Sequence, residues 1–218
     1  MFRILIADDH EVARRGVRAL LESHPGWQVC GEAKDGRETV ELAAQMNPDL
    51  VLLDIGMPNL NGLEASRQIL AASPDTAILI LTMLDSDQVV REVLRVGARG
   101  FLLKSDAGRD LVSAVEALQR QSTFFTTRVS QMVLDGFLRC ENGESAEEEI
   151  EDSPLTTRER EVIQLLAEGK TSKEVAAALN LSVKTAETHR TNLMRKLGLH
   201  CVADLTLYAV RNRIVQVF

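Results

Sequence analysis

Short apolar runs alternate with amphipathic segments through the first 120 residues of the chain. Most of these runs are rich in Val, Ile and Leu and stop abruptly at a polar residue, which is typical of strands buried inside a parallel sheet. The expected strands are residues 3–7, 28–33, 50–54, 77–82 and 100–104. The expected helices are residues 12–24, 36–46, 62–72, 86–97 and 108–120. The alternation predicts an α/β fold in which a five-stranded, doubly wound parallel sheet is joined by right-handed crossovers.

The pattern changes after residue 120, and we expect three parts: a domain over 1–120, a connecting segment over 121–153 and a second domain over 154–218. Residues 126–139 have the apolar spacing of a connecting helix. Residues 141–154 are almost all acidic or small and cannot bury enough apolar area to offset the entropy lost on ordering, so they predict a flexible linker.

The last part predicts a small all-α domain of four short helices with a helix-turn-helix arrangement. Thr156 with Glu159, and Thr171 with Glu174, have the spacing of capping boxes at the start of two helices. Ser182 is the expected cap of a third helix over 183–197, which ends before Gly198, and a fourth covers 202–214.

Charge separates the second domain from the rest of the chain. The net charge of the whole sequence is −7, whereas residues 154–218 carry ten Lys and Arg against six Asp and Glu, a net charge of +4. A local basic surface of this kind favours a polyanionic partner. The three cysteines are isolated and no segment is long enough to span a membrane, so we expect reduced thiols, no membrane partner and a cytoplasmic location.

Polar side chains follow four of the expected strands. Two carboxylates, Asp8 and Asp9, follow the first strand, and Asp54, Thr82 and Lys104 end three others. The carboxyl ends of parallel strands meet at one edge of a sheet, where ligands bind. A carboxylate there can attack phosphorus, but three crowded carboxylates need a cation, and Mg²⁺ suits this set. The sequence therefore predicts a site that forms an acyl phosphate.

Residues 1–120 resemble a response-regulator receiver domain, which has a flavodoxin-like fold. The resemblance rests on ADDH at 7–10, PDLVLLDIGMPNLNG at 48–62, ILTM at 80–83 and GARGFLLK at 97–104. It implies that Asp54 is the phosphoacceptor, that Asp8 and Asp9 hold Mg²⁺ together with Asp54 and the Gly56 carbonyl, and that Lys104 contacts the phosphoryl group. It also implies that Thr82 and Phe101 form a switch. The chain departs from the family pattern at Phe101, where Tyr is frequent, and at Ser105, where Pro is frequent.

The third helix of the second domain divides into two faces. Ala186, Leu193 and Leu197, flanked by Val183, form an apolar face, and short polar and cationic residues form the other. That division suits a recognition helix in the major groove, with hydrogen-bonding groups toward the bases and cations toward phosphate. The expected DNA-contacting residues are Lys184, Thr185, Glu187, Thr188, Arg190, Thr191, Asn192, Arg195 and Lys196.

Residues 154–218 resemble the LuxR-type helix-turn-helix over nearly their full length, and the pair of domains resembles the NarL/FixJ subfamily of two-component response regulators. The resemblance implies a transcriptional regulator that takes phosphate from a sensor histidine kinase and binds double-stranded promoter DNA. It implies no enzymatic activity beyond phosphotransfer to Asp54 and slow autodephosphorylation. A small module of modest charge should bind DNA weakly alone, so we expect phosphorylation to promote a homodimer.

Three alternatives compete with this interpretation. A phosphatase that passes through an aspartyl phosphate needs a second Asp two residues after the nucleophile, where this chain has Gly56. A ligand-sensing regulator would not place three carboxylates in an apolar pocket. The third alternative keeps the fold but not the phosphate: an atypical receiver that acts as a phosphorylation-independent DNA-binding dimer.

Overall fold

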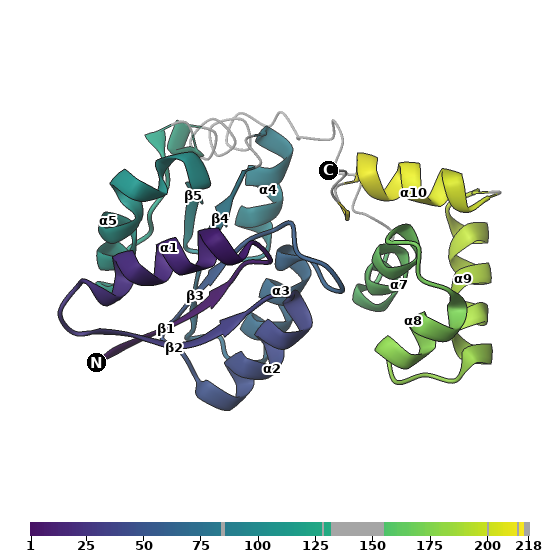
Figure 1. Cartoon of the computed structure of the whole chain (residues 1–218). Coiled ribbons are helices and arrows are strands. Elements are labelled where there is room, and N and C mark those ends of the chain that lie inside the picture. The colour runs from purple at the N-terminus through teal and green to yellow at the C-terminus, as the bar shows by residue number, and fades with distance from the viewer. Residues whose placement is uncertain (84–85, 128, 132–154, 200, 213, 216–218) are drawn as a thin grey trace.

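The structure is a computed structural model that describes residues 1–83, 86–127, 129–131, 155–199, 201–212 and 214–215 (Figure 1). The expected acidic linker over 141–154 lies outside the described residues, as does Cys140. Of the expected connecting helix over 126–139, residues 126, 127 and 129–131 are described, and all of these except 126 are helical. The boundaries proposed at residues 120 and 154 therefore stay predictions.

The first domain is built on a five-stranded sheet in which every neighbouring pair of strands is parallel. The strands are β1 (Phe2–Ala7), β2 (Trp27–Ala33), β3 (Leu50–Leu53), β4 (Ala77–Thr82) and β5 (Gly100–Leu103). Their order is β2-β1-β3-β4-β5, so β3 lies at the centre and β2 at one edge. All residues of β3 and β4 are buried, which explains why these strands are continuous apolar runs. The predicted fold class is confirmed.

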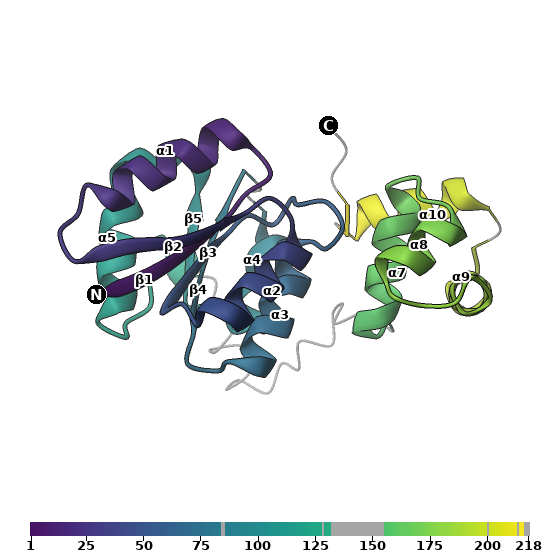
Figure 2. The same cartoon turned by 60° about the horizontal axis from the view of Figure 1, so that its bottom comes forward.

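Helices cover both faces of this sheet (Figures 1 and 2). They are α1 (Glu11–Glu22), α2 (Gly36–Met46), α3 (Gly62–Ala72), α4 (Asp87–Arg95) and α5 (Ala107–Gln119), with a short 3₁₀ turn η1 (Lys104–Asp106) after β5. One core lies under α1 and α5 and includes Leu21 and Val115, and the other lies under α2, α3 and α4 and includes Ile69 and Val93. The sheet is therefore doubly wound.

The loop between β3 and α3 is held tightly against the end of β3. The Gly62 N–H donates to the Ile55 carbonyl at 2.9 Å. A Cβ added at Gly62 would lie 2.0 Å from the Asp54 carbonyl oxygen, so only glycine fits this approach. Asn61 caps α3, because its side chain accepts a hydrogen bond from the Glu64 N–H. The position of Asp54 is thus set by backbone packing on both of its sides.

The second domain consists of α7 (Thr157–Ala167), α8 (Ser172–Ala178), α9 (Val183–Lys196) and α10 (Val202–Arg211). Both predicted capping boxes are present, and Ser182 accepts from the Thr185 N–H at the start of α9. Asn180, in the turn between α8 and α9, has a φ of 53°, and Gly198, just after α9, has a φ of 64°. The last helix ends at Arg211, earlier than the expected residue 214, and a third capping box at Cys201 begins it.

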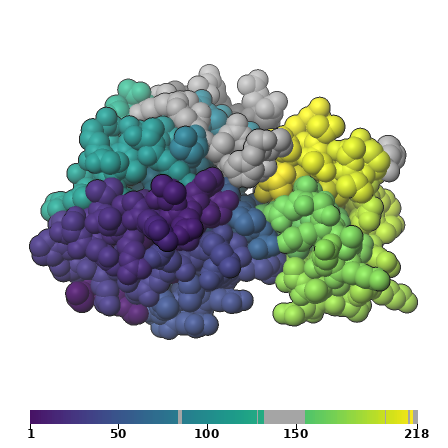
Figure 3. Space-filling view, viewed as in Figure 1, coloured from purple at the N-terminus to yellow at the C-terminus, as the bar shows by residue number. Residues whose placement is uncertain are grey.

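The two domains touch through α7 and the loop after β3. Figure 3 shows them pressed together along one side. In Figures 1 and 2, α7 and the C-terminal end of α10 lie nearest the receiver-like domain, and α9 lies on the far side. Among the described residues, no helix is both long enough and apolar enough to cross a membrane.

Candidate functional site

An ion-paired cluster lies at the carboxyl edge of the sheet. Asp8 follows β1, Asp54 follows β3 and Lys104 follows β5. The Lys104 Nζ lies 2.8 Å from Asp8 Oδ2 and 2.7 Å from Asp54 Oδ2. All three side chains are largely buried, so each charge depends on the others for its stabilisation. The structure therefore brings together three of the predicted residues.

Burial and the charge of Lys104 have opposite effects on the pKa of Asp54. Burial raises the pKa of Asp54 above its ordinary value, and the charge of Asp8 adds to this rise. The hydrogen bond and the charge of Lys104 lower it, as does the Gly56 N–H, but they do not reverse the rise. For Lys104, burial lowers the pKa, yet the contacts with Asp54 and Asp8 outweigh it and the pKa is raised. The lysine therefore stays charged beside Asp54.

Asp9 and His10 extend this cluster toward the surface. One possible ligand atom from each of Asp8, Asp9, His10 and Asp54 lies within 4.8 Å of all the others. The Nδ1 of His10 lies 2.7 Å from Asp9 Oδ1, so the two side chains form an ion pair when the imidazole is protonated. Three carboxylates crowded into this space need a cation to balance their charge. The donor set of carboxylate oxygens fits Mg²⁺.

The predicted switch residues are buried in the sheet. Thr82 ends β4 and is fully buried, and its register partner is Leu103, which precedes Lys104. Phe101 is 2% exposed and belongs to the core under α2, α3 and α4. The Lys104–Ser105 peptide is trans. The roles of Thr82 and Phe101 stay predictions, as does the Gly56 carbonyl as a ligand.

The second candidate site is the outer face of α9. Ala186 and Leu193 are buried in the domain core, as the expected apolar face requires. Val183, which flanks that face, is 40% exposed. All but one of the expected DNA-contacting residues are exposed, and Arg190 is partly exposed. The exposed residues are Lys184, Thr185, Glu187, Thr188, Thr191, Asn192, Arg195 and Lys196.

Several of these side chains are already hydrogen-bonded. The hydroxyls of Thr188 and Thr191 donate to carbonyls one turn earlier, at 2.8 and 2.9 Å, which leaves their oxygen lone pairs as acceptors. Arg195 donates to the Asn192 side chain at 3.1 Å. Lys196 lies 2.8 Å from Glu159, so this lysine also ties α9 to α7. The face presents hydrogen-bonding groups and cations on a rigid helix.

Two groups of residues at these sites escaped prediction from the sequence. His10 lies within the ADDH motif, but no role was assigned to it. Glu161 and Gln164 on α7 and Glu168 just after it form a polar stripe with a spacing of three and four residues. This stripe contacts the loop after β3 and helix α3. Helical spacing could have identified the stripe, but spacing does not tell a face in water from a face against another domain.

Comparison with known proteins agrees with this arrangement. Residues 4–116 match the family described as response regulator receiver domain, and residues 153–209 match bacterial regulatory proteins of the luxR family. The transcriptional regulatory protein LiaR of Bacillus subtilis is 37% identical over 216 residues, which cover 99% of this chain and all of LiaR. The oxygen regulatory protein NreC of Staphylococcus carnosus is 35% identical and covers 98% of this chain and 99% of its own length.

Solved structures of a response regulator align with nearly the whole of this chain. The RcsB response regulator of Salmonella typhimurium aligns with a TM-score of 0.58 and 28% identity, over 95% of this chain and 98% of that one. A structure of an RcsB–DNA complex aligns with a TM-score of 0.57 and 28% identity, over 95% of this chain and 96% of that one.

Proposed function

Because the chain belongs to the two-component response regulators that join a receiver domain to a LuxR-type DNA-binding domain, we propose that phosphorylation of Asp54 controls its transcriptional activity. One observation carries this proposal: the Asp54 carboxylate is buried at the end of β3, with Lys104 at 2.7 Å and Asp8 beside it. That arrangement suits a nucleophile that receives a phosphoryl group. A sensor histidine kinase is the phosphodonor implied by the family.

Each residue at the sheet edge has a separate role in the proposed transfer of a phosphoryl group to Asp54. A lone pair on an Asp54 oxygen attacks phosphorus and forms the new O–P bond, while the bond to the donor breaks and its electron pair leaves with the donor. Lys104 supplies fixed positive charge for the incoming phosphoryl oxygens. Asp8, Asp9, Asp54 and the Gly56 carbonyl would hold Mg²⁺, which when bound offsets the carboxylate charge and contacts a phosphoryl oxygen.

The rest of the receiver then changes conformation in response to the acyl phosphate. Thr82 turns its hydroxyl toward the new phosphate, and Phe101 takes up the space that this movement leaves. The movement of β4, β5 and their helices releases the C-terminal helices and favours a homodimer. A coupling of roughly 1–3 kcal/mol suffices for a several-fold to hundred-fold change in DNA affinity.

The DNA-binding part of the proposal rests on α9. Its exposed face combines Lys184, Thr188 and Thr191 on a helix that lies away from the receiver (Figure 1). We assign Glu187, Thr188 and Thr191 to base edges and the cations to phosphate. Promoter DNA and a sensor kinase as partners support a cytoplasmic location.

Intact-mass spectrometry after incubation with acetyl phosphate and Mg²⁺ tests the phosphorylation. We expect one phosphoryl adduct on the full chain and none on Asp54→Asn. DNA binding is tested by selection from a pool of randomised duplexes, followed by affinity measurements with and without phosphorylation. Equal affinity for phosphorylated protein and Asp54→Asn, with the same salt dependence, would refute phosphate control and support the phosphorylation-independent dimer.

A further inference from the structure

Helix α7 is buried on two sides. Six consecutive residues, 161–166, are buried, whereas a helix packed on a single core leaves its opposite side in water. Val162 and Leu165 belong to the core of the DNA-binding domain. Glu161 and Gln164 are the buried polar residues of α7, at 6% and 2% exposure, and they bond to the receiver. The receiver is therefore the second partner of this helix.

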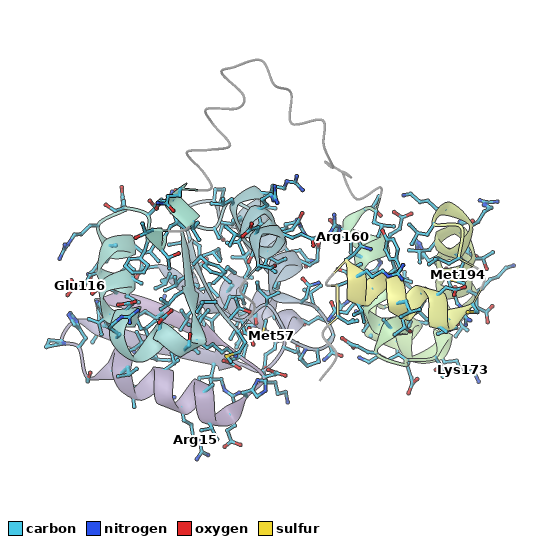
Figure 4. The ribbon with its side chains drawn as sticks, turned by 90° about the horizontal axis from the view of Figure 1, so that it is seen from above. Arg15, Met57, Glu116, Arg160, Lys173 and Met194 are labelled. Carbon is cyan, nitrogen blue, oxygen red and sulfur yellow. The ribbon has the colours of Figure 1, made fainter. Side chains whose placement is uncertain are left out.

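Gln164 bonds to the backbone of the loop after β3. Its Nε2 donates to the Met57 carbonyl at 3.0 Å, and its Oε1 accepts from the Asn61 N–H at 2.8 Å. The side chain of Asn61 also donates to the Ile214 carbonyl at 3.3 Å. Met57 lies on the side of the receiver that faces the DNA-binding domain (Figure 4). This loop begins at Asp54 and contains Gly56, so α7 is bonded to the backbone that positions the phosphorylation site.

Glu168, just after α7, lies against the same loop. Its Oε1 accepts from the Asn59 N–H at 3.0 Å and from Gln164 at 2.8 Å. Lys170 donates to the Asn59 side chain, and its Nζ lies 3.6 Å from the other Glu168 oxygen. Glu168 is thus an ionised partner of Lys170 at the long end of the ion-pair range.

A cavity of about 120 Å³ connects these residues with the acidic site. Its lining includes Asp9 and Gly56 from the receiver and Gln164, Glu168 and Ile214 from the DNA-binding domain. The two domains thus enclose one space, with a carboxylate on each side of it. The DNA-binding domain thus supplies part of the lining of a pocket that reaches Asp9.

We infer that the docked DNA-binding domain forms a wall of the phosphorylation site, and that Gln164 and Glu168 make docking and phosphorylation of Asp54 oppose each other. This inference rests on the proposed phosphorylation. The Glu168 carboxylate repels an approaching phosphodonor and a phosphorylated Asp54, and Gln164 holds Glu168 and the loop in place. Coupling is reciprocal, so a phosphoryl group that is disfavoured by docking also drives the domains apart. Both side chains are positioning residues.

Docking of this kind controls the chemistry of the receiver rather than access to DNA. Helix α9 lies on the side of its domain turned away from the receiver in both ribbon views (Figures 1 and 2). The contacts that hold the domains together involve α7, its C-terminal turn and Ile214. The recognition helix is accordingly accessible while the domains are docked.

The rate of phosphorylation of the full chain by acetyl phosphate with Mg²⁺, followed by intact mass, tests the inference. Glu168→Gln keeps an acceptor for the Asn59 N–H but removes the charge, and we expect phosphorylation about fivefold faster than wild type. The difference should shrink as salt rises, which a merely structural change would not produce. Lys173→Gln is the control, because Lys173 lies on α8 at the far side of the domain (Figure 4) and the rate should stay at the wild-type value.

Gln164→Ala tests whether the charge acts through docking. We expect a similar acceleration, and the double variant should be no faster than the faster single variant, because both act on the same docked state. If the accelerations of the two single variants multiply in the double variant, the inference is overturned. The same holds if Glu168→Gln is phosphorylated at the wild-type rate, and both results leave the proposed function intact. Absence of any adduct on wild type would overturn both.

Hydrogen exchange of the loop over residues 55–61 tests whether docking exists in solution. The Asn59 and Asn61 amides are bonded to side chains of the other domain, so Gln164→Ala should speed their exchange, as should phosphorylation of wild type. Identical exchange in wild type and Gln164→Ala would show that the domains are not docked and would overturn the inference.

Discussion

Two lysines make ion pairs of the same length in very different surroundings. Lys104 lies 2.8 Å from Asp8 at the sheet edge, and Lys196 lies 2.8 Å from Glu159 on the DNA-binding domain. The Lys104 side chain is 11% exposed and that of Lys196 is 35% exposed. Removing one partner of a buried pair leaves an uncompensated charge, whereas a surface pair contributes little.

This difference separates the two functional regions of the molecule. At the sheet edge, the charges of Asp8, Asp54 and Lys104 are paired with one another within the protein. The arrangement of these three side chains therefore does not depend on a phosphodonor. The outer face of α9 holds its groups in water, so its proposed contribution to DNA binding would come only when phosphate and bases replace that water. Substitutions should therefore damage stability and chemistry at the first region, and mainly affinity at the second.

The largest effect is expected from Lys104→Ala. It leaves two buried carboxylates without their cation, so we expect a loss of about 3–5 kcal/mol in the free energy of unfolding. Phosphorylation by acetyl phosphate should slow by about 10²–10³-fold, because the fixed charge that faces the phosphoryl group is lost. Urea denaturation and intact-mass kinetics measure the two effects. A phosphorylation rate within twofold of wild type would contradict the role of Lys104.

Gly62→Ala tests how far packing alone sets the sheet edge. The new methyl group would collide with the Asp54 carbonyl oxygen, so we expect a loss of about 1–3 kcal/mol and slower phosphorylation. Gly108→Ala is the matched control, since a Cβ there would meet nothing within 4 Å and the position lies in α5. It should stabilise the protein by about 0.5–1 kcal/mol. Equal stability of both variants would show that the loop can move aside.

Lys184→Ala should weaken DNA binding without changing stability. If the lysine contacts a phosphate, the affinity falls about equally for all sequences and the salt slope decreases by about one. Titration of a selected duplex at several salt concentrations measures both quantities. An unchanged slope together with altered sequence preference would instead assign Lys184 to a base.

The smallest effect is expected from Lys196→Ala, at about 0.5 kcal/mol of stability. Burial alone would raise the pKa of Glu159, but the hydrogen bonds from Lys196 and Thr156 lower it below its ordinary value of 4.5. A carboxyl group with a lowered pKa stabilises the folded state above that ordinary value and loses this contribution as the pH falls through the lowered pKa. The difference between wild type and variant should therefore be present at pH 7 and vanish in acid.

The sheet edge was largely predictable from the sequence because parallel strands all end at one side. Knowing only where the strands end was enough to expect Asp8, Asp54 and Lys104 in contact. The exposure of Val183 was not predictable from a helical wheel, since a wheel gives direction but not how far the core extends along α9. The second partner of α7 was also not predictable, because Gln164 and Glu168 are compatible with a face in water.

The contacts that dock the domains involve backbone groups on the receiver side: the Met57 carbonyl and the N–H groups of Asn59 and Asn61. Every residue type supplies a carbonyl, and every residue type except proline supplies an N–H. These three hydrogen bonds depend on the path of the loop, whereas the side chains of Asn59, Asn61 and Gln68 add contacts that depend on the receiver sequence. A receiver grafted from another protein should therefore keep the hydrogen bonds to Gln164 and Glu168 if its loop follows the same path, and lose the side-chain contacts where its sequence differs.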